Sequence, residues 1–327
     1  MSARGVRWQV QRAVWALTPP VLLPPVRSLA RRLGLATPPT VAAAPAEAAP
    51  VPAEAPAVEA APAPPHWEYV PEGFAREAKG WNVQAISDAY REKWPSYLAA
   101  IEGPKPLGVY HEVPSGQAVG FEDHGAHNTL VSYAYVLALA ARTRDRISLL
   151  DWGGGIGHYL PLSRALVPGV EIDYHCKDVP VLAEHGRELF PEASFYDDDS
   201  CLQRRYDLVL ASASLQYAPD WRTTLTALAG ATDGLLYVTR APIALRSASF
   251  VVLQRAYDYG YDTEYLGWVF NRDELLAVAR ESGGELVREF LFSAWLSAAG
   301  APEAPIGHRG FLFARRPTGI ESNTPAG

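Results

Sequence analysis

Residues 148–157 read Ser-Leu-Leu-Asp-Trp-Gly-Gly-Gly-Ile-Gly, an apolar run that leads directly into a glycine-rich turn. The residues from His158 onward have the spacing of a helix. Glycine lets a backbone approach a ligand closely and take positive φ at little cost, and a helix N-terminus presents free N–H groups. The stretch therefore predicts a strand, a turn and a helix whose junction faces a ligand, although tight turns need glycine even without a ligand.

The spacing of the glycines separates two kinds of ligand. A dinucleotide-binding turn has the pattern G-x-G-x-x-G, but the sixth position counted from Gly153 is His158. The residues read instead acid-x-G-x-G-x-G, with Asp151 at the end of the strand. This spacing disfavours an NAD-linked oxidoreductase, which is kept as an alternative.

Strand-like and helix-like segments alternate after residue 146, which predicts a parallel sheet covered on both faces. The expected strands span residues 147–151, 170–176, 194–196, 206–211 and 235–239. The expected helices span residues 158–166, 179–190, 221–229 and 274–281. Two last strands, 286–292 and 310–314, have only a loop between them, so we expect them to pair antiparallel. The fold class is therefore α/β, with five parallel strands, a terminal antiparallel hairpin and a helical N-terminal cap over residues 67–146.

Polar residues follow the later strands at the points where they end. Asp178 comes after the second strand, directly before Val179; its carboxylate suits a pair of hydroxyl groups and also suits capping of the next helix. Three acids, 197–199, follow the third strand; Asp198 is preferred slightly over Asp197 as a ligand contact, and the others are expected to be solvated or to cap a helix. The fourth strand opens into residues 212–217, whose small side chains allow a ligand to approach.

Together these residues resemble the class I S-adenosylmethionine-dependent methyltransferases over roughly residues 125–315. The resemblance implies a Rossmann-like sheet and S-adenosylmethionine as the cofactor. It implies that Asp151 and the turn hold the amino-acid tail of the cofactor, Asp178 the ribose and Asp198 the adenine amino group. The expected cofactor-binding residues are Asp151, Gly153, Gly154, Gly155, Gly157, Asp178, Val179, Asp198 and Ser212.

A narrower resemblance is to a bacterial family of methyltransferases often associated with surface-polysaccharide genes. It rests on residues 127–141, the turn at 151–157, residues 212–217 with Trp221, and the aromatic region 250–270. The short basic, proline-interrupted apolar start of the chain is also similar to members of that family. The resemblance implies a cofactor site and no particular acceptor.

Residues 241–270 form an insertion that is longer than a plain connection and rich in aromatic side chains. Loops at the carboxyl ends of parallel strands form the ligand crevice of open α/β sheets. We expect a lid over the acceptor, since aromatic faces suit sugar rings and planar phenols; the alternative is that these residues pack the insertion onto the sheet. Arg240, which precedes the insertion, suits an anionic acceptor group or a neighbouring acid.

Methylation of a hydroxyl requires removal of a proton, for which histidine is the usual group. His127 is the first candidate and His124 the second, because both precede a helix expected to cover the cofactor. Tyr217 is a third candidate catalytic residue, or else a wall residue that packs on the sheet edge. His158 opens the first helix of the sheet region and is expected to flank the turn.

The N-terminal part of the chain differs in composition from the rest. Residues 1–34 carry six arginines and no acid; since the whole chain has a net charge of −7, the remainder carries −13. An acidic body argues against a nucleic-acid enzyme. We expect residues 1–35 to be a basic segment that contacts an anionic membrane surface, or else a weakly helical tail. Residues 36–66 are expected to be a disordered Ala/Pro-rich linker, and residues 317–327 a disordered tail.

The expected function is methylation, dependent on S-adenosylmethionine, of a hydroxyl on a glycan or small-molecule acceptor. The alternatives are an NAD-linked oxidoreductase and a catalytically idle domain that binds the cofactor as a scaffold. The two cysteines, Cys176 and Cys201, lack metal-ligand spacing, so we expect no metal and a cytoplasmic protein, peripheral at the inner membrane face if the basic segment binds there.

Overall fold

The computed structural model describes residues 65–102 and 124–316. The chain divides into two units, Met1–Ala61 and Pro62–Gly327, and the fold below belongs to the second. The predictions made for residues 1–35, for the linker up to residue 64 and for residues 317–327 lie outside the described residues.

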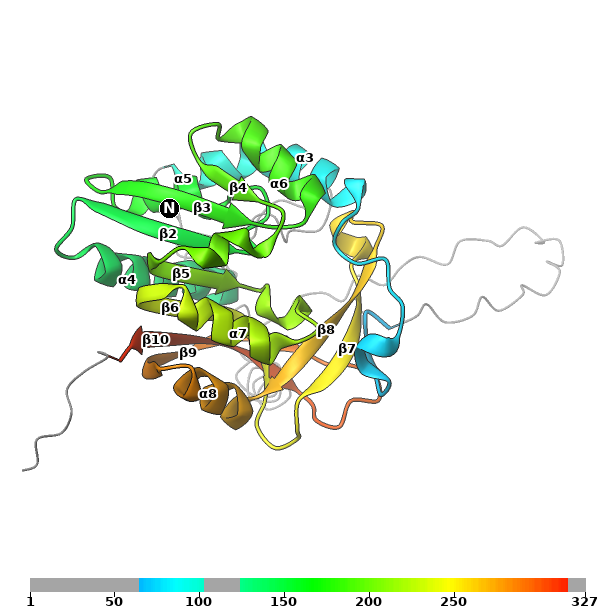
Figure 1. Ribbon diagram of the computed structural model, residues 1–327. Helices are drawn as coiled ribbons and strands as arrows, with labels where there is room; N and C mark the ends of the chain where they lie inside the picture. The colour runs from blue at the N-terminus through cyan, green and yellow to red at the C-terminus, as the bar shows by residue number, and fades with distance from the viewer. Residues whose placement is uncertain (1–64, 103–123, 317–327) are drawn as a thin grey trace, which may run out of the picture. The chain divides into compact units, whose positions relative to one another are not determined.

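The centre of the fold is a parallel sheet whose strands follow the order β4-β3-β2-β5-β6 (Figure 1). These strands are β2 (Arg146–Trp152), β3 (Glu171–Lys177), β4 (Ser194–Tyr196), β5 (Tyr206–Ser212) and β6 (Thr232–Ala244). The five expected parallel strands are confirmed. Successive strand residues point to opposite faces, so Leu149 and Leu150 each lie in a different apolar core.

Helices cover both faces of this sheet. One face packs against α4 (His124–Ala141) and α5 (Tyr159–Leu166), and the other against α7 (Trp221–Gly230) and α8 (Arg272–Glu281). α6 (Pro180–Leu189) contacts β4 and α3 (Gln84–Ile101). Short 3-10 helices connect these elements: η2 (Gly73–Ala75), η4 (Asp199–Gln203), η5 (Leu215–Tyr217) and η6 (Tyr257–Tyr259). Within the described residues, no helix is both long and apolar enough to cross a membrane.

The last two strands form the expected antiparallel hairpin. They are β9 (Gly284–Leu296) and β10 (Ile306–Arg315), both longer than the sequence indicated. β10 also runs antiparallel to β6, from the pair Gly307 and Ile243 to the pair Ala314 and Leu235. The hairpin therefore completes the sheet beside the fifth parallel strand.

The aromatic insertion contains two strands that sequence reading missed. They are β7 (Phe250–Arg255) and β8 (Glu264–Asn271), which pair antiparallel with each other. β8 continues the main sheet because Phe270 and Asn271 pair in parallel with the end of β6 (Figure 1). Both strands are rich in β-branched and aromatic residues, which favour strands, but we interpreted the aromatic content as a lid.

The start of the expected helical cap is also a strand. β1 (Trp67–Val70) pairs antiparallel with β7 and lies at the edge of the ten-stranded mixed sheet. The prediction of helices with loops from residue 67 onward is therefore wrong for these four residues. A run this short carries too few residues for its alternation to stand out, and it depends on pairing with β7 and with Ala299 for its stability.

Candidate functional site

A cavity of about 1030 Å³ opens where the central parallel strands end. Trp152 at the end of β2, Asp178 after β3 and Ser212 at the end of β5 all line it. This is the position of the ligand crevice in open α/β sheets. The volume lies at the upper end of the range for small-molecule sites, so one cavity has room for a cofactor and a second molecule.

The glycine turn forms one wall of the cavity. Gly153 and Gly155 have φ of +75° and +63°, a conformation that favours glycine. A Cβ atom on Gly154 would lie 2.2 Å from Asp151 Oδ2, so a larger residue has no space there. Gly157, which was also expected to bind the cofactor, is not among the lining residues, and a Cβ atom there would lie 3.0 Å from the Phe195 ring and 3.3 Å from the Phe190 ring.

Asp151 lies beneath the turn, is fully buried, and is not among the residues that line the cavity. The Tyr174 hydroxyl donates to its Oδ2 at 2.5 Å, while its Oδ1 finds no hydrogen-bond partner among the described residues. Burial raises the pKa of this carboxyl to about 7, because a low-dielectric site disfavours the charged form. A buried carboxylate oxygen without a partner suits a cationic group from a ligand above the turn.

Asp178 directly follows β3, and its carboxylate bonds the glycine turn. Its Oδ2 accepts from the Gly155 N–H and its Oδ1 from the Val179 N–H, both at 2.7 Å. Val179 itself is the N-cap of α6, and no side chain caps that helix; Asp178 therefore braces the turn rather than capping α6. Asp178 and Val179 both line the cavity.

The three acids after β4 have three different environments. Asp197 forms an ion pair with Arg187 at 3.3 Å. Asp198 is exposed and caps η4 by accepting from the Ser200 N–H at 3.0 Å. Asp199 lines the cavity, where its Oδ1 lies 3.4 Å from Trp152 Nε1 and 3.8 Å from Lys177 Nζ. The structure thus places Asp199, and not the preferred Asp198, on the wall.

The loop after β5 also lines the cavity. The Ser212 hydroxyl bonds the Tyr159 hydroxyl at 2.8 Å, and the Ser214 hydroxyl donates to the Trp152 carbonyl at 2.6 Å. Ala213 between them has a φ of +51°. Such strain in a non-glycine residue is found mainly at functional sites.

Aromatic side chains form the opposite wall. Trp81 stacks on Tyr265 with ring centroids 4.2 Å apart, and Tyr217 contacts both rings. The insertion contributes further rings to the wall, namely Tyr259, Tyr261 and Trp268. Its remaining aromatics do not share this place, since Tyr257 is half exposed and Phe270 is buried in the core beside Trp221.

A family model described as a methyltransferase domain matches residues 126–289, half of the chain. The chain belongs to this family. It is an S-adenosylmethionine-dependent methyltransferase, and its α/β fold is that of the class I enzymes. Among curated proteins no sequence matches this methyltransferase.

Solved structures similar to this methyltransferase include three other methyltransferases. The magnesium protoporphyrin IX methyltransferase of Synechocystis PCC 6803 is 14% identical, with a TM-score of 0.40 over 71% of this chain and 98% of that chain. The 1,6-didemethyltoxoflavin-N1-methyltransferase of Burkholderia thailandensis is 15% identical, with a TM-score of 0.40 over 73% and 93%. A methyltransferase of Clostridium acetobutylicum is 10% identical, with a TM-score of 0.40 over 57% and 91%.

The residues around the glycine turn fit the cofactor of this enzyme class. Asp151 has a buried oxygen to offer to a cationic amino group, and the glycines leave no Cβ atoms between the backbone and a ligand. Asp178 and Asp199 place two carboxylates on the wall for hydroxyl and amino groups. Among the residues that the structure describes, no group of His, Cys, Asp or Glu is arranged to hold a metal ion.

His124 and His127, the two candidate bases, are not among the residues that line the cavity, whereas His158 flanks the glycine turn as expected. His124 and His127 belong to the first turns of α4, but the residues of α4 on the wall are Gly125, Ala126 and Thr129. His158 does line the cavity. It is buried against the edges of three aromatic rings, those of Tyr90, Trp94 and Tyr97, and burial lowers its pKa to about 3.

A second histidine on the wall was not predicted from the sequence. His308 lies in β10, and its Nδ1 is 3.2 Å from the Ala294 carbonyl of β9, so Nδ1 carries the proton of that hydrogen bond. Burial lowers the pKa of His308 to about 4. We treated the terminal hairpin as structural only, and no local motif marks a histidine that reaches the site from a strand edge.

Proposed function

We propose that this methyltransferase transfers the methyl group of S-adenosylmethionine to a hydroxyl of a small-molecule or glycan acceptor. The observation that supports this most directly is the continuity of the cavity. Its walls run from the glycine turn and Asp178 to the aromatic residues of the insertion without a barrier. Aromatic walls suit planar phenols and the apolar faces of sugar rings.

The residues that line the cavity near the glycine turn are assigned to the cofactor. In this proposal the cofactor is held by residues that line the cavity, namely Gly153, Gly154, Gly155, Asp178, Val179 and Ser212. Asp151 supports them from beneath the turn with its unpartnered Oδ1, and Asp199 takes the place at the adenine that the sequence suggested for Asp198. The bound cofactor supplies an electrophilic methyl group. The chain itself contributes alignment of the acceptor oxygen with that methyl, and such alignment supplies much of the rate of a displacement.

The acceptor hydroxyl must lose its proton as its oxygen forms the new bond. The two histidines on the described wall, His158 and His308, are better placed for this than His124 and His127. Tyr217 donates to Gln254 Oε1 at 3.4 Å, and burial raises the pKa of its phenol, so we assign it to positioning the acceptor. We also propose that the acceptor is a glycan rather than a phenol, which is supported by the resemblance to methyltransferases associated with surface-polysaccharide genes.

Two measurements test the function. Calorimetry with S-adenosylhomocysteine measures the cofactor site, and transfer of radiolabelled methyl to a panel of phenols and sugars measures turnover. We expect micromolar binding and label on at least one hydroxyl acceptor. Binding without transfer to any acceptor would favour the idle scaffold, and heat with NAD but none with S-adenosylhomocysteine would favour the oxidoreductase.

Gly154→Ala tests whether the turn holds the cofactor. The new Cβ atom would lie 2.2 Å from Asp151 Oδ2, so the turn or the carboxylate must move, and we expect S-adenosylhomocysteine to bind at least 100-fold more weakly by calorimetry. Gly169→Ala is the matched control, because a Cβ atom at Gly169 meets nothing within 4 Å. Equal affinity in the two variants would show that the ligand does not depend on this turn.

A further inference from the structure

Arg240 enters the cavity from an irregular position in β6. Arg309 pairs with Ala241 and Phe311 with Val238, so Thr239 and Arg240 together face the single residue Gly310. Two residues opposite one is a β-bulge, which redirects a side chain. Arg240 has a φ of +56° in this bulge, a strained conformation for arginine. The strain is confined to the residue whose side chain the bulge delivers to the wall.

The guanidinium of Arg240 lies deep among aromatic side chains. Arg240 is partly buried on the cavity wall, and this burial lowers its pKa to about 10, which leaves it charged at neutral pH. Electrostatic interactions with nearby tyrosine hydroxyls raise the pKa of Arg240 and partly offset the effect of burial; these are Tyr90, Tyr259, Tyr261 and Tyr265. On its other side, the charge of Arg240 helps to lower the pKa of His308. Arginine thus places a positive charge between the insertion and the terminal hairpin.

The backbone connects this charge to the part of the cavity where the cofactor is held. Thr239, the residue before Arg240, accepts a hydrogen bond at its carbonyl from the Ala213 N–H at 3.0 Å. Ala213 lies between Ser212 and Ser214, which also line the cavity. Two strained residues, Ala213 and Arg240, are therefore joined across the ends of β5 and β6. A ligand group on Arg240 would lie next to the loop after β5.

A charge in a low-dielectric cavity interacts strongly with an opposite charge that enters it. Guanidinium also offers paired donors in the geometry of carboxylate and phosphate oxygens. We propose that Arg240 binds an anionic group of the acceptor, a carboxylate or a phosphate, and that the acceptors of this enzyme are therefore hydroxylated acids or phosphorylated hydroxyl compounds. That the bound anion belongs to a methyl acceptor rests on the proposed function, but anion binding by Arg240 does not.

Anion binding can be measured without a turnover assay. The full chain is saturated with S-adenosylhomocysteine and titrated with 4-fluorobenzoate or with 4-fluorobenzyl alcohol, a neutral compound of similar shape, by fluorine NMR. Inorganic phosphate competes in a separate series. We expect 4-fluorobenzoate or phosphate to bind at least tenfold more tightly than the alcohol, since a hydrogen bond to a charged group contributes about 1.5–3 kcal/mol.

Variants at Arg240 identify the group responsible. Arg240→Gln should lose the preference for the anion, and Arg240→Lys should keep most of it because the charge remains. Arg164→Gln is the matched control: Arg164 is an exposed arginine in an ion pair with Glu192 at 2.9 Å, and the variant should behave as the wild type. Unchanged S-adenosylhomocysteine affinity in each variant shows that the fold is intact.

Two results would overturn the anion site. One is equal affinity of the wild type for all three probes, and the other is an anion preference that survives in Arg240→Gln. Failure of methyl transfer to every acceptor, together with an anion preference that depends on Arg240, would count against the proposed function alone. Preference for phosphate over 4-fluorobenzoate would assign the site to phosphorylated acceptors, and the reverse order to carboxylic acids.

Discussion

Asp151 shows how a single buried acid links cofactor binding to pH. Its pKa is raised from 3.8 to about 7 by burial, so between these values the folded chain holds a proton that the unfolded chain has lost. Stability therefore falls as pH rises toward 7 and levels off above it. The cationic amino group of the cofactor favours the ionised form, and binding should offset this loss.

The corresponding variant is Asp151→Asn, which cannot titrate. From pH 5 to pH 8 we expect the free energy of unfolding of the wild type to fall by about 3 kcal/mol relative to this variant, since one pKa unit corresponds to about 1.4 kcal/mol. Denaturant titrations across this range measure the difference. Asp233→Asn, a change at an exposed acid, should follow the wild-type profile. Parallel profiles for wild type and Asp151→Asn would contradict the raised pKa.

At the same scale, the sequence predicted wall residues well where local backbone structure positions them, and poorly where the direction of a side chain depends on the rest of the fold. Glycines 153–155 and Asp178 lie on the wall, because strand, turn and helix fix them locally. Asp198 and Asp199 are neighbours with the same charge, and only the direction of η4 decides which one faces the cavity. His308 comes from the far end of the chain, so no local spacing could place it.

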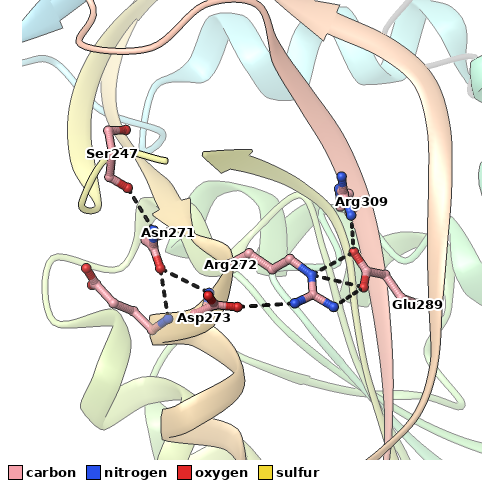
Figure 2. A network of polar contacts seen from close by, with 7 residues as sticks. Ser247, Asn271, Arg272, Asp273, Glu289 and Arg309 are labelled. Carbon is pink, nitrogen blue, oxygen red and sulfur yellow. Dashed lines mark hydrogen bonds and ion pairs between the residues drawn. The ribbon is translucent and has the colours of Figure 1, made fainter. Parts of the chain in front are cut away.

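At the scale of elements, a polar network fastens α8 to the terminal hairpin (Figure 2). Arg272 at the start of α8 donates to both carboxylate oxygens of Glu289 in β9, and Arg309 of β10 bonds the same carboxylate. These pairs lower the pKa of Glu289. The network holds the hairpin of β9 and β10, which carries His308, against α8.

Asn271 joins this network to the insertion. Its Oδ1 caps α8 by accepting from the Asp273 and Glu274 N–H groups, both at 3.0 Å, and its Nδ2 donates to the Ser247 carbonyl at 2.8 Å (Figure 2). Asn271→Ala should cost about 1–2 kcal/mol in unfolding free energy, because loss of an N-cap costs about 1 kcal/mol and a second bond is lost with it. Asn271→Ser keeps a cap oxygen and should cost less. Equal losses by chemical denaturation would show that the cap contributes little.

Helices and strands could be predicted where a long segment showed a clear hydrophobic pattern. The prediction failed where a segment forms a strand only because it pairs with a distant one. The buried strands β2 and β5 carry continuous apolar runs, and the sequence located them within one residue. β1 forms a strand because it pairs with β7, which in turn pairs with β8. Strand propensity depends on such neighbours, which a single sequence does not reveal when they are almost 200 residues apart.

At the scale of the whole molecule, the acidic body and the basic N-terminal segment suggest different environments. The six arginines in residues 1–34 would each contribute about 1 kcal/mol of attraction near an anionic membrane. The fold itself begins at Pro65 and His66, whose carbonyls accept hydrogen bonds from Arg255 at 2.8 and 2.9 Å. A deletion of residues 1–64 preserves these contacts and removes the basic segment.

We expect the full chain to cosediment with vesicles containing phosphatidylglycerol at low salt and to be released as salt increases, because screening weakens exposed charges. The deletion variant should bind these vesicles at least tenfold more weakly and bind S-adenosylhomocysteine with unchanged affinity. Neutral phosphatidylcholine vesicles serve as the control surface and should retain little of either chain. Equal cosedimentation of the two chains with anionic vesicles would place the membrane contact in the folded body or remove it from the protein altogether.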